Sequence, residues 1–328
     1  MRWRARLRTQ AHAAGTHVRA RATPVVATTK PSFRGGYEED AVGATSEEQL
    51  AAMDATLTAM NAAELLAKLR ALSDAGSGYD EQAQCCLLLK DASPLPTGAA
   101  ADDAVRAVLS ALSRGMQHAE LQMCGCCALV MLLRAAPATS TTAGAGGVAA
   151  VLAAMRAHPG DVSVQGFACK ALTELVALDV TNRATAGAAG GLAAVVAAMT
   201  RHPREEVVAK RGCEALVNLT KGHAQNAAVA LEAGAVMAAL TAMRAFPAVA
   251  SVQTTGCAAL GSILDAAGAL GGECADETAA DTITAASGCA HTPATARCRP
   301  KAATCSCASS AALTRLKMLR GSSARPRR

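Results

Sequence analysis

The sequence predicts an all-α fold, arranged as an α-solenoid of about four to five stacked repeats with disordered ends. Three observations lead to this prediction. About a quarter of the 328 residues are Ala, only 2% are Phe, Tyr or Trp, and similar stretches recur every 44 residues. Ala and Leu are strong helix formers, whereas the aromatic residues that favour strands are scarce. A β-barrel or β-sandwich is therefore disfavoured.

The repeat is clearest at three methionines, Met155, Met199 and Met243, each 44 residues from the next. Each methionine closes an apolar segment and is followed by a proline and then by a cysteine that precedes Ala-Leu. An earlier copy around Gln122 has a period one residue shorter, and a weaker copy over 65–90 begins the array. The repeated prolines and cysteines are Pro159, Pro203, Pro247, Cys126, Cys169, Cys213 and Cys257.

Within one copy, apolar residues follow the helical period on two segments, 148–155 and 164–175. The proline between them cannot continue the first helix, and Asp161 or Glu205 suits the N-terminus of the second. A third, short segment over 181–189 or 224–233 joins one copy to the next. Such a unit cannot bury two apolar faces alone, so successive units must stack. The Gly or Ala before each repeated Cys allows neighbouring helices to approach closely.

Charge divides the chain into basic ends and an acidic middle. Residues 1–36 carry eight Lys or Arg and no acid, and residues 271–328 carry nine against four acids, which leaves −7 for residues 37–270. We predict a basic disordered tail or transit segment over 1–36 and a leader with a weak first repeat over 37–98. The repeat array follows over 99–270, and a basic, Cys-containing tail of low complexity over 271–328. The acidic middle disfavours nucleic acid as a partner.

Targeting signals point to an intracellular, cytoplasmic protein. No apolar secretory signal is present, and the longest weakly polar run, 233–243, is too short to span a bilayer. We therefore expect no membrane span. The Arg-rich, acid-free segment 1–36 leaves organellar import as an alternative.

No residue constellation predicts catalysis. Neither the 124–127 cysteine cluster nor the tail cysteines, with His291 nearby, have the ligand spacing of a structural zinc site. His158 and His202 recur because the turn recurs, which indicates a structural role. Phosphate-binding loops, nucleophile elbows and metalloprotease helices are absent from the sequence. We expect no enzyme activity, no cofactor, no metal and no small-molecule substrate.

The repeated Gly-Cys-x-Ala-Leu-x-x-Leu string, preceded by an apolar helix and a turn, resembles the armadillo repeat. Residues 214–219, Glu-Ala-Leu-Val-Asn-Leu, lie where that family commonly has Trp-Ala-Leu-x-Asn-Ile. The His-Pro turn is similar to the subtype in the N-terminal regions of leucine-rich-repeat kinases and in small armadillo-only proteins. This resemblance covers about residues 100–265 and implies a right-handed solenoid of three-helix units. HEAT repeats, with two helices per unit, are the structural alternative.

The resemblance implies that the third helix of each unit lines a concave groove. The family's Trp position holds Cys127, Lys170, Glu214 and Ala258, and its Asn position holds Met131, Glu174, Asn218 and Ser262. The missing Trp ladder argues against binding of basic nuclear-import signals. By register, the predicted groove residues are Met123, Cys127, Met131, Lys170, Glu174, Lys210, Glu214, Asn218, Thr254 and Ser262.

A purely structural role is the alternative to partner binding for these residues. Lys170 with Glu174, and Lys210 with Glu214, have the i,i+4 spacing of solvated intrahelical ion pairs. The methionines suit a core as well as a recognition surface. Asn218 could instead hydrogen-bond the backbone of a neighbouring unit.

Together these features predict a non-enzymatic scaffold that binds a partner protein or peptide along the concave groove. The alternative is a regulatory repeat segment of a larger enzyme such as a kinase. A third hypothesis, association of the basic ends with nucleic acid or membrane, predicts binding that is lost above moderate salt.

Overall fold

The computed structural model describes residues 56–57, 60–91 and 95–268. The chain divides into two units, 1–59 and 60–328, and the helices described below belong to the second. Within the described part of that unit the regular structure consists of twelve α-helices and no strand, which confirms the predicted all-α class. The predicted tails over 1–36 and 271–328 lie outside the described residues.

The helices follow one another with short connections. Their bounds are α3 Ala62–Ala75, α4 Tyr79–Asp91, α5 Ala99–Arg114, α6 Ala119–Ala135, α7 Thr139–Ala157, α8 Val162–Ala177, α9 Val180–Ala188, α10 Gly191–Arg201, α11 Glu206–Thr220, α12 Ala224–Glu232, α13 Ala235–Ala245 and α14 Ala250–Gly268.

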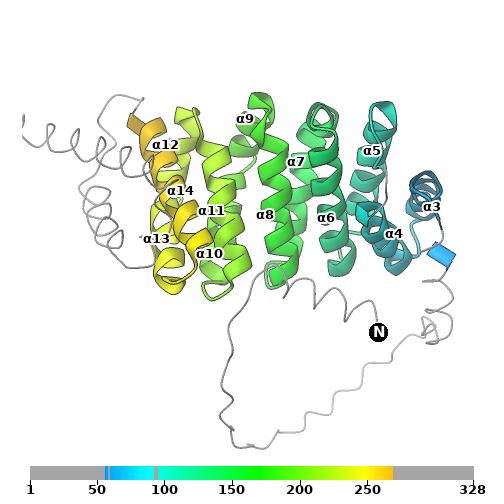
Figure 1. Ribbon diagram of the computed structural model, residues 1–328, viewed down its shortest axis with the longest axis horizontal. Helices are drawn as coiled ribbons and strands as arrows, with labels where there is room; N and C mark the ends of the chain where they lie inside the picture. Colours follow the sequence, from blue (N-terminus) through cyan, green and yellow to red (C-terminus); the bar gives the residue numbers. More distant parts are fainter. Residues whose placement is uncertain (1–55, 58–59, 92–94, 269–328) are drawn as a thin grey trace, which may run out of the picture. The chain divides into compact units, whose positions relative to one another are not determined.

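All of these helices except α9 and α12 pack in two rows (Figure 1). In the first, which we call the α8 row, α4 contacts α6, α6 contacts α8, α8 contacts α11 and α11 contacts α14. In the second, the α10 row, α3 contacts α5, α5 contacts α7, α7 contacts α10 and α10 contacts α13. Each helix of one row also packs on its sequence neighbour in the other. Each helix of the two rows before α13 therefore contacts both its own repeat and the next.

The core between the rows consists of the apolar residues that the helical periodicity selects. Val151 and Leu152 of α7 and Val164, Leu172 and Leu175 of α8 are fully buried. Burying one such side chain stabilises the fold by about 1.5–3 kcal/mol. The apolar faces predicted for the two long segments of a repeat are thus confirmed.

Glycine lets the rows approach closely. A Cβ atom on Gly212 would lie 2.5 Å from Cγ of Met199, and one on Gly256 would lie 2.5 Å from Cγ of Met243. Real Cβ atoms do not approach another atom so closely, so a larger residue requires the Met199 or Met243 side chain, or the helix that carries it, to shift. The predicted role of the small residue before the repeated Cys is confirmed at both positions.

Short linking helices tie each repeat to the one before it. The Asn226 amide of α12 donates to the carbonyls of Leu219, at 2.8 Å, and Arg183, at 3.0 Å. Asn182, 44 residues earlier on α9, likewise donates to the carbonyls of Leu175 and Ser140. The predicted linking segments are confirmed to within one residue. In α7 the equivalent link continues into the following helix through a kink at Gly144, whose φ is +42°.

The turn histidines His158 and His202 also hydrogen-bond to the preceding repeat. Nε2 of His158 donates to the Met116 carbonyl, and Nε2 of His202 donates to the Pro159 carbonyl, both at 2.8 Å. Each imidazole therefore joins one turn to the preceding turn. These hydrogen bonds support the structural role predicted for the two histidines.

None of the described helices is by itself both long and apolar enough to cross a membrane. Taken together, α12 and α13 reach the required length and composition, but their axes bend by 69° at the break between them.

Candidate partner-binding site

The predicted groove residues all lie on successive helices of the α8 row. Their positions are Met123, Cys127 and Met131 on α6, Lys170 and Glu174 on α8, Lys210, Glu214 and Asn218 on α11, and Thr254 and Ser262 on α14. Thr254 is exposed and the other nine are half-buried. We call the surface formed by these ten residues the row face.

Ion pairs link three helices across the row face. Lys170 Nζ lies 3.1 Å from Glu174 Oε1 on its own helix and 3.2 Å from Glu214 Oε2 on α11. Glu174 Oε1 also lies 3.5 Å from Nε of Arg134 on α6. We call these four side chains the charge chain. Lys170, Glu174 and Glu214 keep only 22%, 18% and 23% of their side-chain exposure, so solvent screens their attraction less than on an open surface.

The predicted intrahelical pairs are only half correct. Lys170 pairs with Glu174 as the spacing predicts, but the Lys210–Glu214 pair is wrong: within the described residues Lys210 makes no ion pair. Glu214 instead contacts Lys170, because the packing of α8 on α11 brings a second cation to its carboxylate. The interhelical alternative for Asn218 is also wrong, since its amide donates to the Glu214 carbonyl of its own helix at 3.0 Å.

At the α14 end of the row face the hydroxyl groups are bonded internally. Ser262 Oγ lies 2.9 Å from Thr220 Oγ1 and donates to the Val217 carbonyl at 3.2 Å. Thr254 Oγ1 donates to the Ala250 carbonyl at 2.9 Å. Both hydroxyl groups therefore have hydrogen-bond partners within the chain.

Sequence analysis missed a stacked pair one turn before the charge chain. The Arg211 guanidinium carbon lies 4.3 Å from the ring centroid of Phe167, in a cation–π arrangement between α11 and α8. Phe167 is one of three Phe residues in the chain. Arg211 lies 44 residues after it, so the period could have placed the two side chains on adjacent helices.

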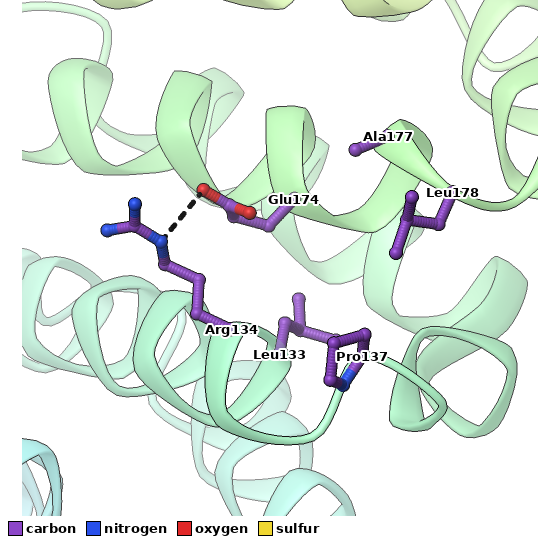
Figure 2. Close-up of a pocket in the computed structure, with 6 residues that line it drawn as sticks. All are labelled: Leu133, Arg134, Pro137, Glu174, Ala177 and Leu178. Carbon is purple, nitrogen blue, oxygen red and sulfur yellow. Dashed lines mark ion pairs between the residues drawn. The ribbon is translucent and has the colours of Figure 1, made fainter.

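A pocket of about 250 Å³ opens where α6 and α8 end. Figure 2 shows Glu174, Ala177 and Leu178 on one side and Leu133, Arg134 and Pro137 on the other, with the Arg134–Glu174 ion pair at the edge. Leu178 is 74% exposed. Pockets for drug-sized ligands enclose about 300–1,000 Å³, so this one suits a single apolar side chain better.

The buried cysteines of the α8 row are poor nucleophiles. Burial raises the pKa of the Cys126, Cys169 and Cys213 thiols to about 12, because desolvation disfavours the thiolate. Burial also raises the pKa of Cys86 well above its ordinary value. Among the described residues no group of three or more His, Cys, Asp or Glu side chains is placed to hold a metal ion.

Comparisons with known proteins do not identify a family. No protein-family model matches the chain, and a search of curated proteins returns no match. A crystal structure described as that of an engineered protein aligns over 66% of this chain and 96% of its own, with a TM-score of 0.42 and 17% sequence identity.

Proposed function

We propose that the helical unit is an armadillo-like α-solenoid that binds a partner protein or peptide along the row face. The observation that carries this proposal is the succession of α6, α8, α11 and α14. The repeat register assigns these helices to the groove, and they pack side by side in that order. A peptide lying across them would contact every repeat, so that many small contacts on a preformed surface add up.

The side chains on the row face support a mixed apolar and charged partner. The pocket beside Leu133 and Leu178 offers an apolar recess, and the charge chain lies at its edge. A buried apolar anchor surrounded by polar contacts is a common arrangement at protein interfaces. The scaffold is held by its own hydrogen bonds and ion pairs, so little ordering cost falls on it during binding.

The proposal can be tested by selecting ligands from a display library of random dodecapeptides with the full chain. Selected peptides are resynthesised and titrated against the wild-type protein, Lys170→Glu and Glu214→Lys. Each substitution places like charges side by side in the charge chain, so we expect affinity to fall at least about tenfold. Circular dichroism verifies that each variant keeps its helicity.

Arg201→Glu is the matched control, because Arg201 is exposed on α10 of the other row and makes no ion pair within the described residues. This variant is expected to bind as the wild type does. The double variant Lys170→Glu with Glu214→Lys restores the interhelical pair in reverse and separates a binding defect from a folding defect. Unchanged affinity in both single variants would contradict the proposal.

A further inference from the structure

The last described repeat has a stacking surface that no described helix covers. On α11, Cys213 and Thr220 are fully buried, and Thr220 Oγ1 lies 2.9 Å from Ser262 Oγ on α14. Cys257 and Leu264 occupy the equivalent positions of α14, one period later, and are only half-buried. The surface that α14 covers on α11 is therefore open on α14 itself, within the part of the chain that the structure describes.

The linking helix α12 adds an apolar side chain to this surface. Gly187 of α9 lies against the next linking helix, since a Cβ atom there would overlap the Asn226 side-chain amide of α12. The equivalent residue of α12, 44 residues later, is the half-buried Leu231. A further repeat could not stack on α12 as α12 stacks on α9, because that close approach requires a glycine. We call the surface formed by Leu231, Cys257 and Leu264 the end face.

Acidic residues adjoin the end face. Glu232 directly follows Leu231 and is the one charged residue of α12; Asp265 directly follows Leu264 and is the one charged residue of α14. Both are exposed, and neither forms an ion pair with the nearby Lys221 within the described residues. The last turn of α14 has no basic residue, although a helix C-terminus favours a cation. Two copies joined through their end faces would bring these carboxylates together, which disfavours a second copy as the occupant.

One stretch of the chain after α14 has the apolar and basic residues that suit the end face. Four of the six Leu, Ile or Met residues that follow α14 lie within 311–320. Leu313, Leu316 and Leu319 are spaced three residues apart, so on a helix they would share one face. The same ten residues include three Lys or Arg and no acid.

The connection is long enough for this stretch to reach the end face. Residues 269–312 separate α14 from Leu313. A coil of that length has a root-mean-square end-to-end distance of about 35 Å, whereas the 19 residues of α14 extend over about 28 Å. Tethering over this range gives an effective concentration on the order of millimolar, so a contact of modest affinity would be formed most of the time.

We infer that residues 311–320 pack against the end face and form a C-terminal cap of the repeat array. The three leucines cover the apolar surface, and the cations lie beside Glu232 and Asp265. A solenoid requires a terminal unit of this kind, because its last repeat has no neighbour to bury its apolar side chains. In this stretch the cap replaces the disorder predicted for 271–328. The inference does not depend on partner binding at the row face.

Alkylation of Cys257 in the full chain tests the inference. The wild type and the double variant Leu316→Asp with Leu319→Asp are treated with N-ethylmaleimide, and mass spectrometry follows labelling at each cysteine. We expect Cys257 to be labelled at least about tenfold faster in the variant, because two carboxylates keep the stretch off an apolar surface. Cys213, buried one repeat earlier, is the internal control for unfolding and should stay slow in both proteins.

Further controls identify the occupant. Ile283→Asp alters another large apolar residue after α14 and is expected to leave the labelling rate of Cys257 unchanged. A synthetic peptide of residues 309–322 added to the double variant should restore slow labelling, whereas the peptide with both substitutions should not. Equal Cys257 rates in the wild type and the double variant would overturn the inference. A wild-type rate that rises on dilution would overturn it too, because a second copy would then cover the end face.

Discussion

Two turns one period apart, α7–α8 and α10–α11, have the same backbone hydrogen bonds but different side-chain support. In both, the turn histidine N–H donates to the carbonyl four residues earlier, at 3.1 Å: His158 to Ala154, and His202 to Ala198. In the first turn, Gln165 Nε2 also donates to the carbonyls of Met155 and His158, both at 2.9 Å. In the second, Ala209 occupies the equivalent position.

The helix starts and the helix packing differ as well. Asp161 accepts hydrogen bonds from the backbone N–H groups of Ser163 and Val164, whereas Glu205 makes no side-chain capping bond. The fully buried Ala168 of α8 corresponds to Gly212 of α11, which has no room for a Cβ atom. The repeat backbone therefore forms with different side chains supporting its turns. Each solution contributes stability locally, so the repeats need not be equally stable.

The largest change in the free energy of unfolding is expected at Gly212, where the helix packing of the two turns differs. Gly212→Val places a branched side chain against Met199 and should lower the free energy of unfolding by about 2–3 kcal/mol, because the Met199 side chain or α10 must shift. Urea denaturation followed by circular dichroism measures the change. Gly261→Ala is the control: nothing lies within 4 Å of its added Cβ inside α14, so it should stabilise the protein by about 0.5–1 kcal/mol. Equal stability of both variants would contradict this account of Gly212.

Removing the two hydrogen bonds that Gln165 Nε2 donates should make the α7–α8 turn resemble the α10–α11 turn, where Ala209 occupies the equivalent position. Gln165→Ala removes the side-chain donor from the buried Met155 carbonyl and leaves the His158 carbonyl with the Asp161 N–H, so we expect a loss of about 1–3 kcal/mol in the free energy of unfolding. The same denaturation experiment measures it. Gln225→Ala, at an exposed position of α12, should change stability by less than about 0.5 kcal/mol. If both alanine variants have the same free energy of unfolding, the hydrogen bonds of Gln165 contribute nothing to stability.

The reverse substitution introduces a glutamine into the α10–α11 turn, at Ala209. Ala209→Gln should donate to the carbonyls of Met199 and His202 and raise the free energy of unfolding by about 1 kcal/mol. The two turns share their backbone bonds, so the longer side chain meets the same carbonyl geometry as Gln165. A lower midpoint of urea denaturation than in the wild type would show that this site lacks the space.

The smallest difference is expected at the helix starts. Asp161→Ala removes two capping hydrogen bonds and should cost about 1 kcal/mol. Glu205→Ala should be nearly neutral, because that side chain caps nothing. Thermal unfolding of the pair measures the contrast. A cost for Glu205→Ala as large as that for Asp161→Ala would show that helix capping does not distinguish the two turns.

The sequence alone determined the local structure and the repeat positions. Apolar periodicity located the two long helices of each repeat, and the recurring small residue before Cys marked the close approaches at Gly212 and Gly256. These features depend on neighbours within a few residues or on one fixed period, both of which are visible in a linear string.

Contacts between side chains of different helices follow from the packing of the helices and could not be predicted from their spacing. Spacing alone predicted that Glu214 pairs with Lys210, but the packing of α11 on α8 brings the Glu214 carboxylate to Lys170 instead. The same packing stacks Arg211 on Phe167 and forms the pocket between Leu133 and Leu178. Such contacts depend on the separation and rotation of adjacent helices, which are set by how all their side chains pack together and not by the spacing along any one helix.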